Sequence, residues 1–163
     1  MGTQRRAYEF GHKPKCLVVV DDTPEADRAV YYASRWAARV GGGVVMLRVI
    51  ETEDRNQQWL GVADIMRAEA HEEANAALDQ AAQRAGQSAL TPERVIREGD
   101  ASEQIADVIA QDVDIIKLAL AAGSGPDGPG PMVTAIAAAA GAFPIPITLV
   151  PGDLTDAELD ALA

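Results

Sequence analysis

The segment Cys16-Leu-Val-Val-Val-Asp-Asp-Thr-Pro-Glu25 decides the fold class of this 163-residue chain. Its first half is apolar and mostly β-branched, which is typical of a buried parallel strand. Helix signals follow directly, because Thr23 can cap a helix, Pro24 suits its first turn and Glu25 favours the positive end of its dipole. The segment therefore predicts a strand followed by a helix, which the glycines at 41–43 end.

Strand and helix patterns alternate along the rest of the chain. Alternation of this kind predicts right-handed crossovers and an open parallel sheet with helices on both faces, an α/β fold. In the longest expected helix Met66 belongs to an apolar stripe, and Gly86 supplies the stop. Further strands are expected at 44–50, 94–97, 114–120 and 145–150, and further helices at 60–86, from Asp100 onward and at 132–140.

Composition excludes several classes of partner. The net charge of −11 disfavours nonspecific binding to nucleic acid or to an anionic membrane surface. No apolar run is long enough for a membrane span. Cys16 is the single cysteine, so no intramolecular disulfide can form and a cytoplasmic location is expected. Residues 1–14 form a basic N-terminal tail, expected to be mobile and solvated rather than a docking arm.

Two segments follow strands at the edge where open parallel sheets bind ligands. Asp21 and Asp22 come after the first strand and have three possible roles: magnesium ligands, contacts to a ribose or base, or helix-entry caps. The glycine-rich loop 121–131 follows the fourth strand, and its glycines let backbone N–H groups approach a phosphate. Pro129 stands where a Walker A loop has its lysine, and no Lys or Arg occurs from Ala121 to Ala163.

The other side chains that could act in catalysis, metal binding or base stacking are expected to have structural roles. Lys117 lies within the fourth strand and is expected to pair with a carboxylate or extend to the rim. The two histidines show no metal-ligand spacing and are expected to be solvated. No nucleophile with a base partner can be assembled, so we expect no enzyme. Packing roles, in the core or an interface, are expected for Trp36, Trp59 and Met66.

The order and spacing of these segments resemble the universal stress protein family. The resemblance covers about 15–152 and rests on Val18-Val-Val-Asp21, Val49-Ile-Glu51, Glu98-Gly-Asp100, the glycine loop and Pro144-Ile-Pro-Ile-Thr-Leu-Val150. It implies a single-domain five-stranded sheet of order 3-2-1-4-5. It also implies a cytoplasmic stress-response regulator that binds ATP or AMP, with Mg, and turns over little or none of it. The implied contacts are Asp21 to the ribose or metal, Val49 through its backbone to adenine, and Gly123, Ser124, Gly125 and Thr134 to the phosphates.

A second function stays open beside nucleotide binding. Leu120 and Val133 stand where nucleotide-binding members have glycines, and the loop is rich in proline. Both departures suit a dimeric interaction module that has lost nucleotide binding. In either case the uncharged last strand, 145–150, is expected at the sheet edge and predicts a homodimer through that strand. The C-terminal segment 153–163 is expected to form a short docked helix, because Thr155 and Glu158 have capping-box spacing.

Overall fold

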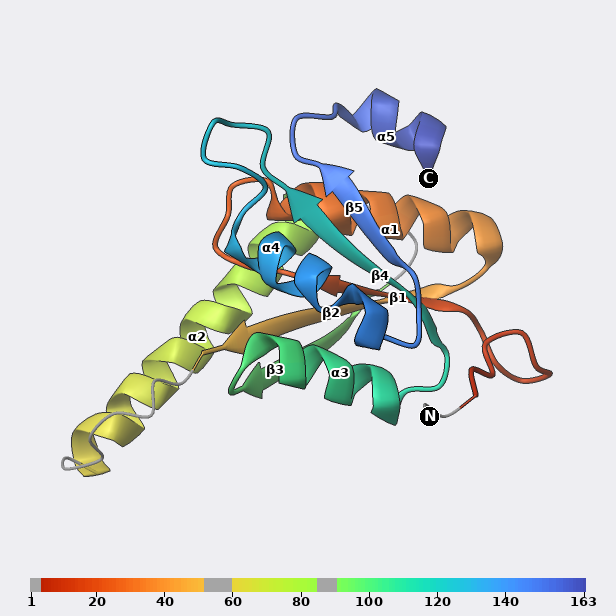
Figure 1. The fold of residues 1–163 in the computed structure, drawn as a ribbon. Helices are drawn as coiled ribbons and strands as arrows, with labels where there is room; N and C mark the ends of the chain where they lie inside the picture. Colours follow the sequence, from red (N-terminus) through yellow and green to blue (C-terminus); the bar gives the residue numbers. More distant parts are fainter. Residues whose placement is uncertain (1–3, 52–59, 85–90) are drawn as a thin grey trace.

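A parallel sheet of five strands organises the molecule, in the order β3-β2-β1-β4-β5 (Figure 1). This arrangement confirms the predicted α/β fold class and strand order. The computed structural model describes residues 4–51, 60–84 and 91–163. The strands are β1 (Lys15–Val19), β2 (Gly43–Ile50), β3 (Glu93–Glu98), β4 (Ile115–Ala122) and β5 (Ile147–Pro151).

Helices cover both faces of the sheet (Figure 1). The first face buries a core under α1 and α2, in which Met46 and Leu78 are fully buried, and the other a core under α3 and α4, with Leu47 and Ile105. No helix of the described residues is long and apolar enough to cross a membrane. The helices are α1 (Ala26–Val40), α2 (Leu60–Arg84), α3 (Ala101–Gln111), α4 (Pro131–Ala138) and α5 (Asp156–Leu162), with a 3-10 turn η1 (Ala140–Ala142).

Helix α1 follows β1 as the opening sequence predicts. It begins two residues later than the expected cap at Thr23 and first turn at Pro24, because Thr23 bonds to Asp21 instead, and its N-cap is Glu25. It ends at Gly41, whose left-handed backbone (φ 68°) lets its N–H donate to the carbonyl of Ala37. Glycine adopts this conformation without the steric cost that a Cβ imposes. The buried face of α1 includes Ala29, Val30 and Ala33, so the helix lies flat on the sheet.

Helix α2 corrects the prediction of one continuous apolar stripe. Ala74, Leu78 and Ala81 are buried, but Met66 is 62% exposed, so its expected packing in the core is wrong. In Figure 1 the first half of α2 projects beyond the sheet, and there it has no strand to pack on. An alanine-rich helix offers several faces of similar hydropathy, so the sequence alone does not tell which turns are covered. Trp59 and the stop expected at Gly86 lie outside the described residues.

Helix α4 and strand β5 differ by up to two residues from their predicted bounds. Strand β5 begins at Ile147 rather than at Ile145, and α4 ends at Ala138 rather than at residue 140. Pro146 cannot donate to the strand ladder, and it instead accepts a hydrogen bond from the N–H of Leu118 (3.0 Å). Ile145 still lies in the core and is 6% exposed. The sequence pattern therefore predicts an apolar, buried residue there correctly, but not the residue at which the strand begins.

The N-terminal segment is a docked arm, which corrects the expectation of a mobile tail. The guanidinium of Arg5 donates to the carbonyls of Ile109 (2.7 Å) and Asp112 (3.0 Å), at the C-terminal end of α3. A cation at that end satisfies carbonyls that have no intrahelical partner and complements the helix dipole. His12 is not simply solvated either, because its Nδ1 lies 2.6 Å from a carboxylate oxygen of Asp114.

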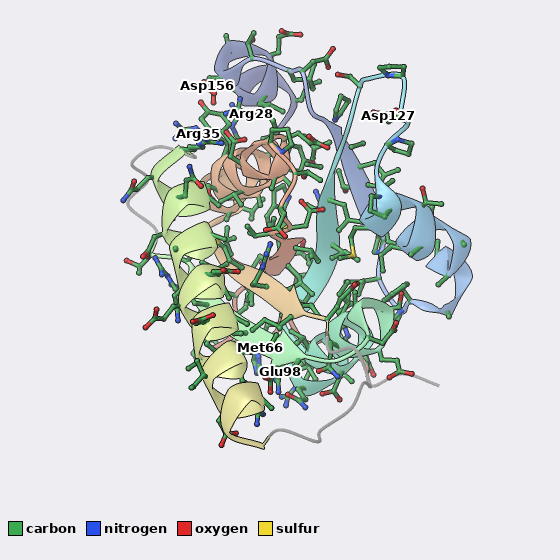
Figure 2. All side chains as sticks on the ribbon, turned by 90° about the vertical axis from the view of Figure 1, so that its left-hand side faces the viewer. Arg28, Arg35, Met66, Glu98, Asp127 and Asp156 are labelled. Carbon is green, nitrogen blue, oxygen red and sulfur yellow. The ribbon has the colours of Figure 1, made fainter. Side chains whose placement is uncertain are left out.

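At the other terminus, α5 docks on α1 as a short helix, in agreement with the prediction. Thr155 and Glu158 form the expected capping box, and Leu159 is fully buried. The phenol of Tyr31, on α1, donates to Asp160 (2.8 Å). Figure 2 shows Arg28 and Arg35 of α1 gathered near Asp156, and Arg28 pairs with that carboxylate at 2.7 Å. The C-terminal helix thereby closes the α1 face beside β5.

Lys117 finds a partner that the sequence did not suggest. Its ammonium lies 4.7 Å from the ring centre of Trp36 and 5.3 Å from that of Tyr32, and it donates to the Tyr32 hydroxyl (3.2 Å). The faces of aromatic rings attract cations, so two rings take the place of the expected carboxylate. This arrangement also explains the packing of Trp36 against the α1 core.

Candidate ligand site at the carboxyl edge of the sheet

A cavity of about 580 Å³ opens at the carboxyl ends of β1 and β2. This volume is in the range of ordinary small-molecule sites, and the position is where open parallel sheets bind ligands. Among the described residues, its walls come from residues 19–23 at the end of β1, residues 48–51 at the end of β2, Ala70 and Glu73 of α2, residues 100–102 at the start of α3, and Pro131, Met132 and Ala135 of α4.

The peptide groups of Val49 face this cavity. Ile50 accepts a hydrogen bond from the N–H of Gly99 (3.0 Å), so the peptide groups of Ile50 face β3. Consecutive residues of a parallel strand alternate in the side to which their N–H and C=O point, so those of Val49 face the β1 side. There β1 ends at Val19, and the last backbone bond joins the N–H of Val20 to Leu47 (2.8 Å). Val49 therefore presents a donor and an acceptor beyond the end of β1.

Asp21 and Asp22 both line the cavity but play different parts. Asp21 accepts hydrogen bonds from the N–H of Thr23 (3.0 Å) and from its hydroxyl. This is the helix-entry role, and both bonds go to Oδ1. Asp22 instead pairs with the guanidinium of Arg48 at 2.5 Å and stays largely exposed. The acidic pair is thus divided between a turn and an ion pair.

Arg48 is the basic residue that sequence reasoning missed. It is the one cation among the described residues that line this cavity. Its side chain is 13% exposed, and besides Asp22 it bonds to the carbonyl of Val20 (3.1 Å). A charged residue near the carboxyl end of an otherwise apolar strand is a signal, since such a side chain must find partners at the rim. From the sequence, we applied this reasoning to Lys117 but not to Arg48.

The four predicted phosphate contacts lie away from the cavity walls. Thr134 is exposed, and its hydroxyl donates to the carbonyl of Gly130 (2.9 Å). The N–H of Gly123 donates to Pro129 (3.0 Å), which closes the loop on itself. Ser124 and Gly125 are exposed on the same loop. The structure therefore brings Asp21 and Val49 together, whereas Gly123, Ser124, Gly125 and Thr134 lie outside the cavity lining, and all six stay predictions as ligand contacts.

Metal and thiol chemistry have little support in the described residues. Among residues 4–51, 60–84 and 91–163, no group of at least three His, Cys, Asp or Glu side chains could hold a metal ion. Cys16 is fully buried in β1, and this burial raises the pKa of its thiol to about 12. A thiol that stays protonated near neutral pH is a poor nucleophile.

An ion pair at the end of β3 holds the α2 wall of the cavity. The guanidinium of Arg67 donates to the carboxylate of Glu98 (2.7 Å), and His71 lies 3.4 Å from the same carboxylate. The Arg67 bond holds the pKa of Glu98 below its usual range. Helix α2 also supplies Ala70 and Glu73 to the lining. The ion pair therefore fixes the wall of the cavity that α2 forms.

Comparisons with known proteins agree with this architecture. UspA from Lactobacillus plantarum has 20% sequence identity and a TM-score of 0.68, and the match covers 84% of this chain and 97% of that one. A universal stress protein from Archaeoglobus fulgidus in complex with dAMP has 17% identity and a TM-score of 0.60, over 84% and 97% of the two chains.

A universal stress protein in complex with cAMP has 19% identity and a TM-score of 0.58, covering 84% of this chain and 96% of that one. No curated protein sequence matches the chain. The family model described as the universal stress protein family matches residues 14–121. This range begins just before β1 and includes β1 to β3 and nearly all of β4. On that match, the chain belongs to the universal stress protein family.

Proposed function

We propose that this protein is a cytoplasmic stress-response regulator that binds the adenosine part of ATP, AMP or a related nucleotide in the cavity at the ends of β1 and β2. The observation that carries the proposal is the peptide edge of Val49, which has no backbone partner among the described residues. Adenine carries an amino donor next to a ring-nitrogen acceptor, which complements one N–H and one C=O of the same residue. The dAMP and cAMP complexes of related structures support this ligand class.

The lining suits a nucleoside in other respects as well. The apolar side chains of Val19, Ile50 and Met132 offer contacts for a flat base. Asp21 has its Oδ2 unbonded within the described residues, which suits a ribose hydroxyl. Any Mg would arrive with the nucleotide phosphates. No nucleophile and base are paired at this edge in the described chain, so binding without turnover is proposed.

Isothermal calorimetry with adenosine, AMP and Mg–ATP tests this proposal. Ala135 lines the cavity from α4, so Ala135→Phe fills it and is expected to weaken micromolar binding more than tenfold. Ala137→Phe is the matched control, because Ala137 is exposed on the same helix but does not line the cavity. Silence of the wild-type protein at millimolar concentrations of all three ligands contradicts the proposal.

A dimeric interaction module without nucleotide binding is the second candidate. The self-bonded loop after β4 favours it, because the Gly123 N–H is already used. So does β5, which is an edge strand with its charge-free sequence Ile-Thr-Leu-Val-Pro and a 45% exposed Leu149. Unpaired strand edges without charges are usually covered, and a second copy pairing antiparallel about a twofold axis would cover this one.

Sedimentation equilibrium tests the dimer, which is compatible with either function. The expected mass is twice 17.2 kDa, and Leu149→Lys is expected to shift it toward the monomer. Leu162→Lys is the control, because Leu162 is an exposed leucine on α5 rather than on the edge strand. A wild-type monomer at high micromolar concentration contradicts the dimer.

A further inference from the structure

Glu25 occupies an unusual place between two glycines at the carboxyl ends of β4 and β5. A Cβ on Gly152 would lie 2.5 Å from the Cβ of Glu25 and 2.9 Å from the carbonyl of Ala122. A Cβ on Gly123 would lie 3.0 Å from Oε1 of Glu25. The side chain of Glu25 therefore packs directly on two stretches of backbone, and its carboxylate reaches the first residue of the glycine-rich loop.

The loop offers this carboxylate no positive counterpart. Within the described residues Glu25 makes no side-chain hydrogen bond or ion pair, and its neighbour Gly123 donates to Pro129. The single charged side chain of 121–131 is Asp127, which Figure 2 shows on the outer end of the loop. Pro126, Pro129 and Pro131 have no N–H to donate. The loop thus presents negative charge and few donors.

The loop and the cavity adjoin. Thr23 lines the cavity two residues before Glu25, and Pro131 lines it at the far end of the loop that Gly123 begins. The strand order reverses between β1 and β4, and the ligand crevice of an open sheet lies at such a reversal. Glu25 itself lies just outside the cavity lining, between the Thr23 wall and Gly123, so a group that extends from the β1 end toward β4 approaches its carboxylate.

We propose that Glu25 is a specificity-determining residue that makes this site select an uncharged nucleoside, adenosine itself, over its 5′-phosphates. The inference rests on the proposed nucleoside binding and deepens it by naming the ligand class. A carboxylate repels a phosphate, and no cation on the loop compensates, whereas a 5′-hydroxyl donates a hydrogen bond to the carboxylate. Like charges about 5 Å apart in a partly hydrated crevice change affinity by about tenfold.

Calorimetric titration of adenosine and AMP into the wild type, Glu25→Gln and Asp127→Asn tests this inference. The wild type is expected to bind adenosine about tenfold more tightly than AMP. Glu25→Gln removes the charge with little change in volume and is expected to bring the ratio close to one. Asp127→Asn removes one charge from the exposed end of the same loop and is expected to leave the ratio unchanged.

Salt gives a second measurement that needs no variant. Raising the ionic strength screens the repulsion, so the wild-type preference for adenosine is expected to shrink. Wild-type binding of AMP equal to that of adenosine overturns the inference and leaves the proposed function intact. A ratio that Glu25→Gln does not change also overturns it. Absence of binding of both ligands to wild type and Glu25→Gln overturns the proposed function and this inference together.

Discussion

The two ends of the same sheet edge are built in opposite ways. At β1 and β2 the ladder stops early, and the peptide groups of Val49 remain open toward a cavity of about 580 Å³. At β4 the chain turns back on itself, with the N–H of Gly123 bonded to Pro129 and that of Gly128 bonded to Gly125 (3.2 Å). A glycine-rich loop therefore offers N–H donors to a ligand only where its own carbonyls have not already accepted them.

The charges differ between the two ends as well. The cavity end contains Arg48, whose guanidinium satisfies the carbonyl of Val20 and pairs with Asp22. The loop end contains the carboxylate of Glu25 against Gly123, and this carboxylate has no partner in the part of the chain that the structure describes. The two ends of this sheet edge therefore differ in charge as well as in their open hydrogen-bonding groups.

The largest expected effect is at Gly152, where the loop end depends on close backbone packing. Gly152→Ala places a Cβ against both Glu25 and the carbonyl of Ala122, and the second of these is backbone that cannot rotate away. We expect a loss of about 1–3 kcal/mol in the free energy of unfolding, as in other overpacked sites. Urea denaturation of the wild type and the variant measures it.

The control for this substitution is Gly125→Ala on the loop itself. A Cβ there would meet no atom within 4 Å, and the backbone of Gly125 is not in the left-handed region. We expect a change of no more than about 0.5 kcal/mol. If Gly152→Ala were as mild as Gly125→Ala, Glu25 would not be clamped between the two glycines.

Most of the fold was predictable from sequence, because its signals are local and agree with one another. The apolar run before Asp21 and the helix signals after it indicate one β-α unit, and repetition of that unit indicates a parallel sheet, whose strand order the family resemblance supplied. Burial of α2 was not predictable, because the face of an alanine-rich helix that meets the sheet depends on where the sheet ends. Met66 shows this, since its helical spacing is right and its environment is solvent.

The site was less predictable than the fold. Asp21 and Val49 could be placed at one edge because they end neighbouring strands. The position of Glu25 could not, because it depends on the approach of Gly152, more than a hundred residues away, to the start of α1. Likewise, the docked arm depends on Arg5 reaching the end of α3, a contact between distant residues that no local pattern records.

An intermediate effect is expected at the cavity end. Arg48→Met keeps most of the buried stem but removes the guanidinium, so the carbonyl of Val20 loses its bond and Asp22 loses its partner. We expect a loss of about 1 kcal/mol in the free energy of unfolding, because the buried carbonyl becomes unsatisfied. Urea denaturation measures it, with Arg84→Met, an exposed arginine of α2, as the control. A variant as stable as the wild type would show that the guanidinium does not hold the end of β1 to β2.

The smallest expected effect concerns the wall of the cavity and appears as a dependence on pH. The bond from Arg67 lowers the pKa of Glu98 in the folded protein, so the folded state holds the carboxylate more strongly ionised than the unfolded state does. This stabilisation is present above the unfolded carboxyl pKa of about 4.3 and is lost as the pH falls through the lowered folded value. Glu98→Gln is therefore expected to be slightly less stable than the wild type at pH 6, and the difference is expected to shrink as the pH falls toward 3. Glu69→Gln, which removes an exposed carboxylate from α2, the helix of Arg67, is expected to show no such convergence. Urea denaturation at both pH values checks it, and a gap between wild type and Glu98→Gln that is as large at pH 3 as at pH 6 would mean that the ion pair is not what holds the end of β3 to α2.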